Sequence, residues 1–155
     1  MTIERAKEYL RKYGLEDRVQ EFDVSSATVE LAAKALGCEP ALIAKTMSFM
    51  VKEKPVVVVL AGDVKIDNSK FKQEFETKAK MLKYEEVEEL IGYAVGGVCP
   101  FGVNEGVDIY LDESLKRFTT VYPACGSSNS AVKITVEELQ NCLDYKRWVD
   151  IAKLA

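Results

Sequence analysis

Apolar positions with helical spacing open the chain and predict its first helix. They lie three or four residues apart: Ile3, Ala6, Leu10 and Tyr13. Gly14 follows, where a glycine commonly ends a helix. A second helix is expected over residues 29–36, because hydroxyl side chains that can cap it come just before and Gly37 comes just after. An extended piece over residues 19–22 separates the two helices.

Two strands joined by a hairpin are predicted next. Residues 44–51 alternate between two faces, and Lys45 shares its face with Met47. Residues 55–62 form a continuous run rich in valine, which is typical of a strand covered on both faces. The charged residues 52–54 between these runs predict the tip of the hairpin.

The remainder of the chain predicts further helices and short strands. Asp67 or Asn68 can cap a helix that carries Phe71 and Phe75 four residues apart. The later elements are a helix over 84–91, a glycine-rich segment over 92–106, a strand over 107–111, a helical turn over 113–117, strands over 118–124 and 131–135, a helix from Thr135 to Leu143 that begins with a capping box, and a tail with Trp148.

The order of these elements indicates one α+β domain over residues 1–155, built around a mixed sheet. Helices and strands alternate in the first part, and strands with short links follow. A chain of 155 residues suits one domain, and it contains no repeat, low-complexity stretch or linker that would divide it.

The absence of histidine restricts the possible chemistry more than any other feature of the composition. With no histidine in the chain, a Ser-His-Asp triad, a Cys-His pair, an H-E-x-x-H zinc site and a histidine-ligated haem are excluded. Catalysis must rest on lysine, carboxylates, hydroxyls, thiols, backbone amides or the substrate itself. The four cysteines are far apart and form no C-x-x-C pair, so we interpret them as buried thiols in a reducing compartment: Cys38, Cys99, Cys125 and Cys142.

Charge and hydropathy limit the possible partners. A net charge of −4 and a pI near 5.1 argue against a broad basic face that coats nucleic acid, but they allow contact with one end of it. The longest apolar run, residues 56–61, is far shorter than the roughly 20 residues of a membrane-spanning helix. The charged N-terminus lacks the apolar region of a signal peptide. We expect a cytoplasmic protein with no membrane segment.

A glycine-rich stretch over residues 92–102 is the first candidate site. It holds four of the nine glycines and one of the four prolines. Paired glycines let amide N–H groups converge on an oxygen without obstruction by Cβ, as in an oxyanion or carboxylate cradle. A tight connection between two strands has the same composition, and this segment taken alone favours that interpretation. It has neither a Walker A nor a G-x-G-x-x-G pattern.

A strand lysine and a polar turn are two further candidates. Lys45 is either an edge-strand lysine whose stem covers apolar surface or a fixed cation that holds a phosphate or polarises a carbonyl. Residues 125–130 are either an ordinary turn or a set of hydroxyl and amide groups suited to a ribose, a base edge or an α-amino group. The lysines within 65–83 and the acids within 85–89 are interpreted as solvated helix faces.

Several of these segments occur together in one known family. They are Ala44-Lys45-Thr46-Met47, the segment Gly92–Gly102, Thr120-Val121-Tyr122 and Val136-Glu137-Glu138-Leu139. On these motifs the chain resembles the YbaK/EbsC family, relatives of the editing domain inserted in bacterial prolyl-tRNA synthetases. The resemblance runs from about Val29 to Leu143, and the G-Y-x-V-G-G-x-x-P-x-G pattern is its most specific part.

The resemblance implies a central mixed, largely antiparallel sheet flanked by helices, and an enzyme that hydrolyses the ester of a mischarged aminoacyl-tRNA in trans. Lys45 matches the strand lysine of the family, which is expected to engage the phosphate of the terminal adenosine or the substrate carbonyl. The family's G-x-x-x-P loop is expected to bind the aminoacyl ester through backbone amides, with two catalytic glycines and three substrate-binding positions: Gly96, Gly97, Val98, Cys99 and Pro100. No cofactor, metal or protein nucleophile is expected, and a substrate hydroxyl or thiol, or an ordered water, makes the attack.

The chain departs from the family pattern in the polar turn. Ser128 and Ala131 stand where the members closest to YbaK carry a basic and an acidic residue, so cysteinyl specificity is not implied. Ser128, Asn129 and Ser130 are expected to fit the substrate instead. Cys99 has no imidazole to deprotonate it, and we interpret it as a bystander or a minor tuning group.

Three hypotheses follow. The leading one is a deacylase that holds the acceptor end of an aminoacyl-tRNA, most simply tRNA(Pro) carrying a small amino acid, with prolyl-tRNA synthetase as a candidate partner. The second is a non-catalytic module that binds an aminoacyl group or nucleotide in the same pocket and partners a synthetase. In the third, Lys45 and the glycines are structural and the activity is unrelated.

Overall fold

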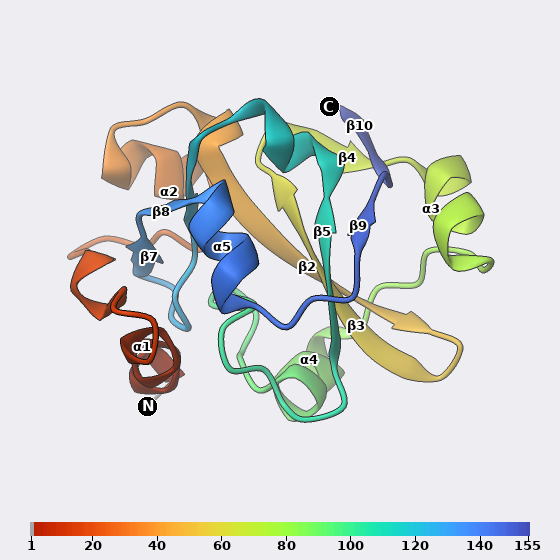
Figure 1. Cartoon of the computed structure of the whole chain (residues 1–155), viewed down its shortest axis with the longest axis horizontal. Coiled ribbons are helices and arrows are strands. Elements are labelled where there is room, and N and C mark those ends of the chain that lie inside the picture. The colour runs from red at the N-terminus through yellow and green to blue at the C-terminus, as the bar shows by residue number, and fades with distance from the viewer. Residues whose placement is uncertain (1) are drawn as a thin grey trace.

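The computed structural model describes residues 2–155 (Figure 1). Its α-helices are α1 (Thr2–Arg11), α2 (Val29–Leu36), α3 (Asn68–Phe75), α4 (Tyr84–Ile91) and α5 (Val136–Cys142). Its strands are β1 (Val19–Glu21), β2 (Ile43–Val51), β3 (Lys54–Ala61), β4 (Val64–Ile66), β5 (Asp108–Asp112), β6 (Thr120–Pro123), β7 (Ser130–Val132), β8 (Ile134–Thr135), β9 (Trp148–Val149) and β10 (Ala152–Leu154). Three 3-10 helices are η1 (Glu16–Arg18), η2 (Pro40–Leu42) and η3 (Glu113–Arg117).

The helices begin and end where the sequence supplies capping residues. The hydroxyl of Thr28 caps α2, and Gly37 ends that helix in the left-handed region at φ +69°. The carboxylate of Asp67 caps α3. Thr135 and Glu138 form the predicted capping box of α5, in which each side chain accepts the other residue's backbone N–H at 3.0 Å.

A six-stranded mixed sheet lies at the centre, in the order β8-β6-β2-β3-β5-β9. β2 and β3 form an antiparallel ladder from the pair Ala44 and Ala61 to the pair Val51 and Lys54. β3 pairs with β5 in parallel, whereas β6 pairs with β2 in parallel only at Ile43 and Ala44. The edge of β2 is therefore open at residues 45–47 on the side of β6, whereas residues 80–82 bond to it at Ser48 and Met50.

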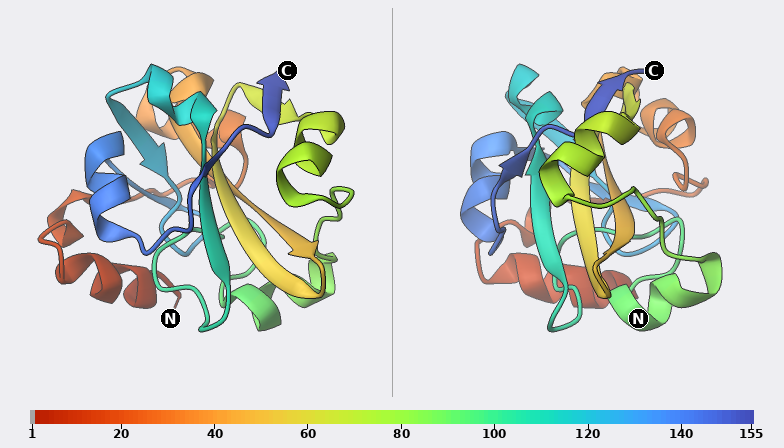
Figure 2. Two further views of the ribbon diagram at one scale, coloured as in Figure 1. Left: turned by 45° about the vertical axis from the view of Figure 1, so that its right-hand side comes forward. Right: turned by 90° about the vertical axis from the view of Figure 1, so that its right-hand side faces the viewer.

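Each face of the sheet has its own hydrophobic core. Val57 and Val59 of β3 belong to a cluster that also contains residues of α1, α4, α5 and the glycine-rich segment. Val56 and Val58, on the opposite face, belong to a cluster with the phenylalanines of α3. Figures 1 and 2 show α1 and α5 on one side of the sheet and α3 on the other. This covering of both faces explains why β3 is a continuous apolar run.

The predicted helices and the mixed α+β sheet are confirmed. Of the strand pairings among the described residues, four are antiparallel and three are parallel. The three parallel pairings all lie in the six-stranded sheet, where the longest ladder, between β2 and β3, is antiparallel.

Two expectations for short segments are wrong. The strand predicted over 131–135 is two strands in different sheets, since β7 pairs with β1 and β8 pairs with β6. The lysines of 65–83 do not share a helix face, because Lys65 lies in β4 and residues 76–83 form a non-helical segment between α3 and α4. The patterns also missed the two- and three-residue strands β4, β9 and β10, which are too short to show a period.

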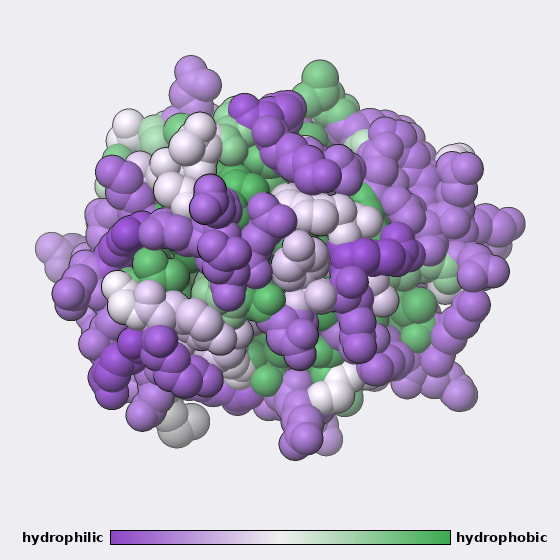
Figure 3. Space-filling view, in the orientation of Figure 1, coloured by the Kyte–Doolittle hydropathy of each residue, from purple (hydrophilic) through white to green (hydrophobic). Residues whose placement is uncertain are grey.

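The surface facing the viewer in Figure 3 is mostly hydrophilic, and hydrophobic residues show only in small separate areas. None of the described helices is long and apolar enough to cross a membrane.

Candidate functional site

A pocket of about 360 Å³ lies at the open edge of β2. Its walls come from β2, α2 and the loop before it, the start of α4, the glycine-rich segment, and the region of β6 and β7. The lining residues that carry the chemistry are Ser26, Lys45, Thr46, Gly96, Val98 and Ser130. Lys45 is the one charged residue in the described lining, and the remaining surface is mostly apolar. The volume is at the lower end of the range of about 300–1,000 Å³ found for small-molecule sites.

Lys45 places a fixed cation in one wall of the pocket. Its side chain is half-buried, and its Nζ donates a hydrogen bond to the carbonyl of Val64 in β4. Burial lowers the pKa of this ammonium, and the nearby carboxylates of Asp63 and Glu30 act in the opposite direction. Arg117 holds Asp63 in place through hydrogen bonds of 2.6 and 3.0 Å. An ammonium has three donors, so Lys45 keeps two for a bound ligand.

The glycine-rich segment reaches the pocket at Gly96 and Val98. The amide N–H of Gly97 donates to the carbonyl of Ala94 at 3.0 Å and is not free for a ligand. The amides of Gly96 and Val98 have no hydrogen-bond partner among residues 2–155. The unpaired backbone donors at this wall are therefore those of Gly96 and Val98, whereas the sequence pattern pointed to Gly96 and Gly97.

Gly97 is needed for a close packing contact. A Cβ at this position would lie 2.7 Å from the backbone nitrogen of Ser127 and 2.8 Å from the carbonyl carbon of Gly126. Gly96 has φ +98°, and a Cβ there would lie 3.3 Å from the Cβ of Ala27. The two glycines let the segment pack directly on the polar turn 125–130 and on the loop before α2, which closes this wall of the pocket.

Cys99 and Pro100 lie behind the pocket wall. Both are buried, and neither belongs to the lining. Burial raises the pKa of the Cys99 thiol far above its usual value, so the nucleophilic thiolate is strongly disfavoured. The structure therefore gives Cys99 a packing position next to the loop.

The polar turn contacts the N-terminal segment of the chain. The Asn129 side chain donates to the carbonyl of Phe22 at 3.0 Å, and the Ser128 carbonyl accepts the N–H of Ser26 at 2.6 Å. Both Ser128 and Asn129 are exposed and neither lines the pocket. The serines at the pocket include the buried Ser26 and Ser130. Ser130 belongs to the polar turn that the sequence predicted as a candidate site, whereas Ser26 was not predicted as a site residue. Their place depends on how β7 and the segment before α2 meet, which no local pattern reveals.

Thr46 is a second pocket residue that the sequence analysis missed. Its Oγ1 is buried and has no hydrogen-bond partner among the described residues. The carbonyl of Ser48 accepts the N–H of Leu82, and the N–H of Met50 donates to the carbonyl of Lys80, so both residues of β2 turn their backbone groups away from β3. Because this direction alternates along a strand, the backbone groups of Thr46 also point away from β3. No strand pairs with it there. An unsatisfied buried hydroxyl is costly, which makes Thr46 a candidate contact for a polar ligand group.

Metal ligands do not gather in this structure. Within residues 2–155, no group of three or more Cys, Asp or Glu side chains is placed to hold a metal ion. The donors on the lining residues include the Lys45 side chain, the unpaired amides of Gly96 and Val98, and several hydroxyls. Such a set favours an anionic or strongly polarised oxygen.

Comparison with known proteins agrees with this geometry. The sequence profile described as the aminoacyl-tRNA editing domain matches residues 23–142. The chain belongs to the aminoacyl-tRNA editing domain family. The resemblance drawn from the sequence motifs is therefore confirmed. Every lining residue of the pocket lies within the matched range, whereas α1 lies outside it.

Relatives in this family cover the chain to different extents. The chain is 46% identical over 154 residues to the uncharacterized protein YwhH of Bacillus subtilis (strain 168), covering 99% of this chain and 98% of that protein. It is 28% identical over 114 residues to EbsC of Enterococcus faecalis, described as a candidate Cys-tRNA(Pro)/Cys-tRNA(Cys) deacylase, with coverage of 72% and 70%. It is 33% identical over 101 residues to a proline–tRNA ligase of Bacillus cytotoxicus, covering 64% of this chain and 18% of the ligase. A crystal structure described as a candidate trans-editing enzyme for prolyl tRNA synthetase matches with a TM-score of 0.87, 28% identity and coverage of 98% and 97%.

Proposed function

We propose that this chain is a trans-editing deacylase that hydrolyses the ester of a small amino acid mischarged to tRNA(Pro). One observation carries the proposal: Lys45, Gly96 and Val98 line the same pocket, and the backbone amides of Gly96 and Val98 have no hydrogen-bond partner among the described residues. The family and the relatives described for prolyl-tRNA editing support both the reaction and the carrier.

Positioning and electrostatic stabilisation suffice for this reaction. Water adds to the ester carbonyl carbon, the bond from that carbon to the ribose oxygen breaks, and the proton of the water ends on the released ribose hydroxyl. Negative charge grows on the carbonyl oxygen during the addition, and the Lys45 ammonium with the amides of Gly96 and Val98 stabilises it. The described lining holds no carboxylate or thiol, and we assign the orientation of the attacking water to the ribose hydroxyl beside the ester.

The volume of the pocket limits the size of the group that enters. About 360 Å³ holds an aminoacyl group and part of the terminal nucleoside. The rest of the tRNA then lies outside, which agrees with the acidic charge of the chain. The apolar side chains of α2 and α4 at the pocket suit a small aliphatic or thiol side chain of the substrate.

Release of labelled amino acid from charged tRNAs tests the proposal. The panel contains Ala-, Cys-, Ser- and Thr-tRNA(Pro) with correctly charged Pro-tRNA(Pro), each treated with the wild type, Lys45→Ala and Lys133→Ala. We expect selective hydrolysis of one mischarged species and a loss of about 100-fold or more in Lys45→Ala, the usual effect of removing one oxyanion donor. The exposed Lys133 lies outside the pocket lining and serves as the matched control. Full activity in Lys45→Ala would rule out this mechanism.

A non-catalytic binding module is the second candidate. The observation that favours it is the absence of a carboxylate or thiol from the described lining, which leaves only hydroxyls and the Lys45 side chain to contact a water. Such a module would bind an aminoacyl-adenosine analogue with an amide in place of the ester, and it would hydrolyse no species of the panel. Binding of the analogue that depends on Lys45, without turnover, would establish this alternative.

A further inference from the structure

A lysine-rich segment, residues 78–84, forms one rim of the pocket. It bonds to the edge of β2 next to the open positions. Met50 donates its N–H to the carbonyl of Lys80 at 2.8 Å, and Leu82 donates its N–H to the carbonyl of Ser48 at 3.2 Å. Met81, Leu82 and Tyr84 of this segment line the pocket. The lysines on either side of these residues are therefore next to the pocket mouth by chain connectivity.

The rim is unusually apolar for an exposed surface. Tyr84 is 75% exposed, the highest value among the large hydrophobic residues of the described chain, and Met81 is 56% exposed. Val95, which is 49% exposed, lines the same pocket from the glycine-rich segment. An exposed aromatic ring beside a ligand pocket offers a flat face on which another ring can stack.

The charges of the segment are unpaired. Lys78, Lys80 and Lys83 are exposed, and none of them forms an ion pair with a residue of the described chain. Residues 78–84 contain no acidic side chain. The acids of α4 begin directly after Tyr84, so they repel a polyanion from α4 and favour a path along the lysines.

We propose that residues 78–84 bind the single-stranded 3′ end of the tRNA, with a terminal base stacked on Tyr84 and backbone phosphates against Lys80 and Lys83. This inference rests on the proposed function and adds the surface by which the RNA enters the pocket. Stacking and phosphate contacts together are the usual means of holding single-stranded nucleic acid without reading its sequence. Exposed apolar residues alone would also suit a protein partner, but the three unpaired lysines complement a polyanion.

Binding of uncharged RNA tests this surface without any need for hydrolysis. The probe is a short RNA that ends in CCA, with 2-aminopurine as the terminal base, whose fluorescence falls when it stacks. The variants are Tyr84→Ala, Tyr84→Phe and the matched control Tyr13→Ala, a tyrosine that is 47% exposed and outside the pocket lining. We expect Tyr84→Ala to bind about 5- to 100-fold more weakly and to lose the quenching, while Tyr84→Phe and Tyr13→Ala behave as the wild type.

Charge reversal at two lysines of the segment, compared with charge reversal at two lysines elsewhere, tests the role of the lysines. Lys80→Glu with Lys83→Glu is compared with Lys133→Glu and Lys153→Glu, two exposed lysines that are not in the segment. We expect the first pair to weaken binding strongly and to reduce the slope of log affinity against log salt by about 1.4, which corresponds to two phosphate contacts on a single strand. Circular dichroism and thermal unfolding show that each variant is folded.

The outcomes separate this surface from the proposed function. Unchanged RNA binding in Tyr84→Ala, or equal weakening by the two lysine pairs, would overturn the surface even if the wild type hydrolyses a mischarged tRNA. RNA binding that depends on Tyr84 and Lys80, without hydrolysis of any species, would support the surface and count against the deacylase. Loss of binding to prolyl-tRNA synthetase in Tyr84→Ala, with RNA binding unchanged, would replace the RNA by a protein partner.

Discussion

Arg5 of α1 donates its Nε–H to the carbonyl of Gly102 at 2.6 Å. Its Nη2 donates to Oδ1 of Asn104 at 2.9 Å. The guanidinium also lies over Gly92, where a Cβ would come within 2.6 Å of Nη1. One side chain thus contacts both ends of the glycine-rich segment, although α1 lies outside residues 23–142 that match the family.

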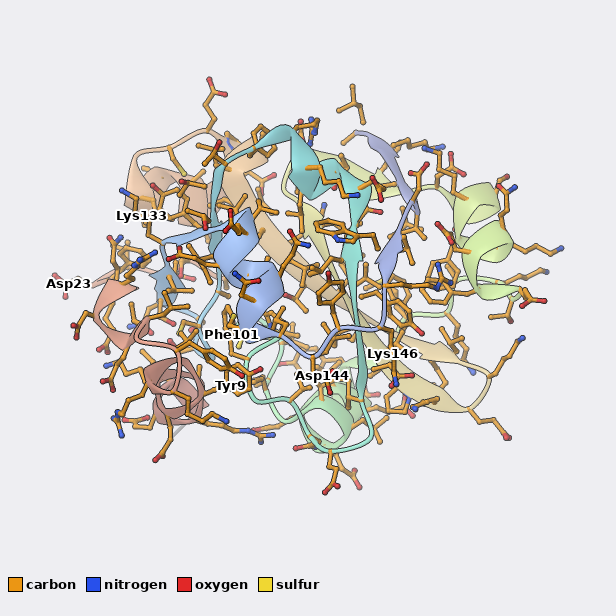
Figure 4. The ribbon with its side chains drawn as sticks, viewed as in Figure 1. Tyr9, Asp23, Phe101, Lys133, Asp144 and Lys146 are labelled. Carbon is orange, nitrogen blue, oxygen red and sulfur yellow. The ribbon has the colours of Figure 1, made fainter. Side chains whose placement is uncertain are left out.

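A second contact joins α1 to the same segment. The rings of Tyr9 and Phe101 lie with their centroids 6.2 Å apart, and Figure 4 shows them side by side. The hydroxyl of Tyr9 donates to the carbonyl of Cys142 at the end of α5. Because α1 is fixed to both α5 and the segment, it supports the backbone that carries Gly96 and Val98.

Arg5→Ala is expected to loosen the glycine-rich segment. Loss of the hydrogen bonds to Gly92, Gly102 and Asn104 lowers the free energy of unfolding by about 1–3 kcal/mol, and Arg5→Lys recovers only part of it because lysine lacks the planar fork. Denaturant unfolding measures the stability, and hydrogen exchange measures the protection of the hydrogen-bonded amides of Gly97 and Asn104. The exposed ion pair of Arg11 with Glu16 supplies the control variant, Arg11→Ala. Exchange in Arg5→Ala that equals the wild type would show that Arg5 does not hold the segment.

The elements that could be predicted from the sequence are those determined by residues close to them in the chain. Caps and apolar spacing place α2, α3 and α5 with close boundaries, because the hydrogen bonds that end a helix lie within a few residues of it. The alternation in β2 and the valine run of β3 likewise reflect which faces are covered. β4 and β10 could not be predicted, since each is held only by pairing with a distant partner.

The site was predictable in outline and not in detail. Lys45 and Gly96 reach the pocket as expected, because the strand and the loop that carry them have clear sequence patterns. The polar turn was interpreted as a ligand site, and of its residues Ser130 lines the pocket while Asn129 bonds the segment before α2. Thr46 was not predicted as a site residue, because threonine is common in strands. Its hydroxyl lacks a hydrogen-bond partner in the described chain, and it lies where no strand pairs with the edge of β2.

Gly97→Ala is expected to disrupt the wall between the loop and the polar turn. The added Cβ would lie under 3 Å from backbone atoms of Gly126 and Ser127, which cannot move without shifting the turn. Overpacking of this kind costs about 1–3 kcal/mol, and we expect deacylation to fall with it. The control is Gly106→Ala, where φ is +92° and a Cβ meets nothing within 4 Å. Since φ of Gly97 is not in the left-handed region, a loss of stability in Gly97→Ala reports the contact with the turn, and wild-type stability in that variant would show that the contact does not require glycine.

Lys45 is expected to lose its proton at a lower pH than the exposed lysines. Burial lowers its pKa, so its neutral form becomes populated first as pH rises. Trace acetylation followed by mass spectrometry between about pH 7 and 11 gives the midpoint for each lysine, with the exposed Lys133 as reference. A midpoint for Lys45 at or above that of Lys133 would contradict a buried ammonium. If the protonated form is the active one, the part of the rate that depends on Lys45 falls over the same pH range.

Thr46→Val is expected to separate stability from activity. The variant keeps the shape of the side chain and removes a buried hydroxyl that has no partner in the described chain. It should therefore raise the free energy of unfolding by up to about 1 kcal/mol and lower the affinity for an aminoacyl-adenosine amide. Thr46→Ser, which retains the hydroxyl, is the control and should keep the affinity. Equal affinity in Thr46→Val would assign the residue a packing role alone.

Arg117→Gln is expected to destabilise the protein near neutral pH and not in acid. Hydrogen bonds from Arg117 lower the pKa of the Asp63 carboxyl in the folded state, so the pair contributes stability above the unfolded pKa of about 3.9 and loses it as pH falls through the folded pKa. Since both side chains are partly exposed, Asp63 at 31% and Arg117 at 40%, the effect on the free energy of unfolding is about 0.5–1 kcal/mol.

Urea unfolding measures this difference in stability. The wild type, Arg117→Gln and the control Lys116→Gln are compared at neutral pH and at about pH 3. A difference that is the same at both pH values would assign the effect of Arg117 to its contacts with the Ser114 carbonyl and the Phe118 ring. A difference that shrinks in acid would show that Arg117 stabilises the carboxylate beside Lys45.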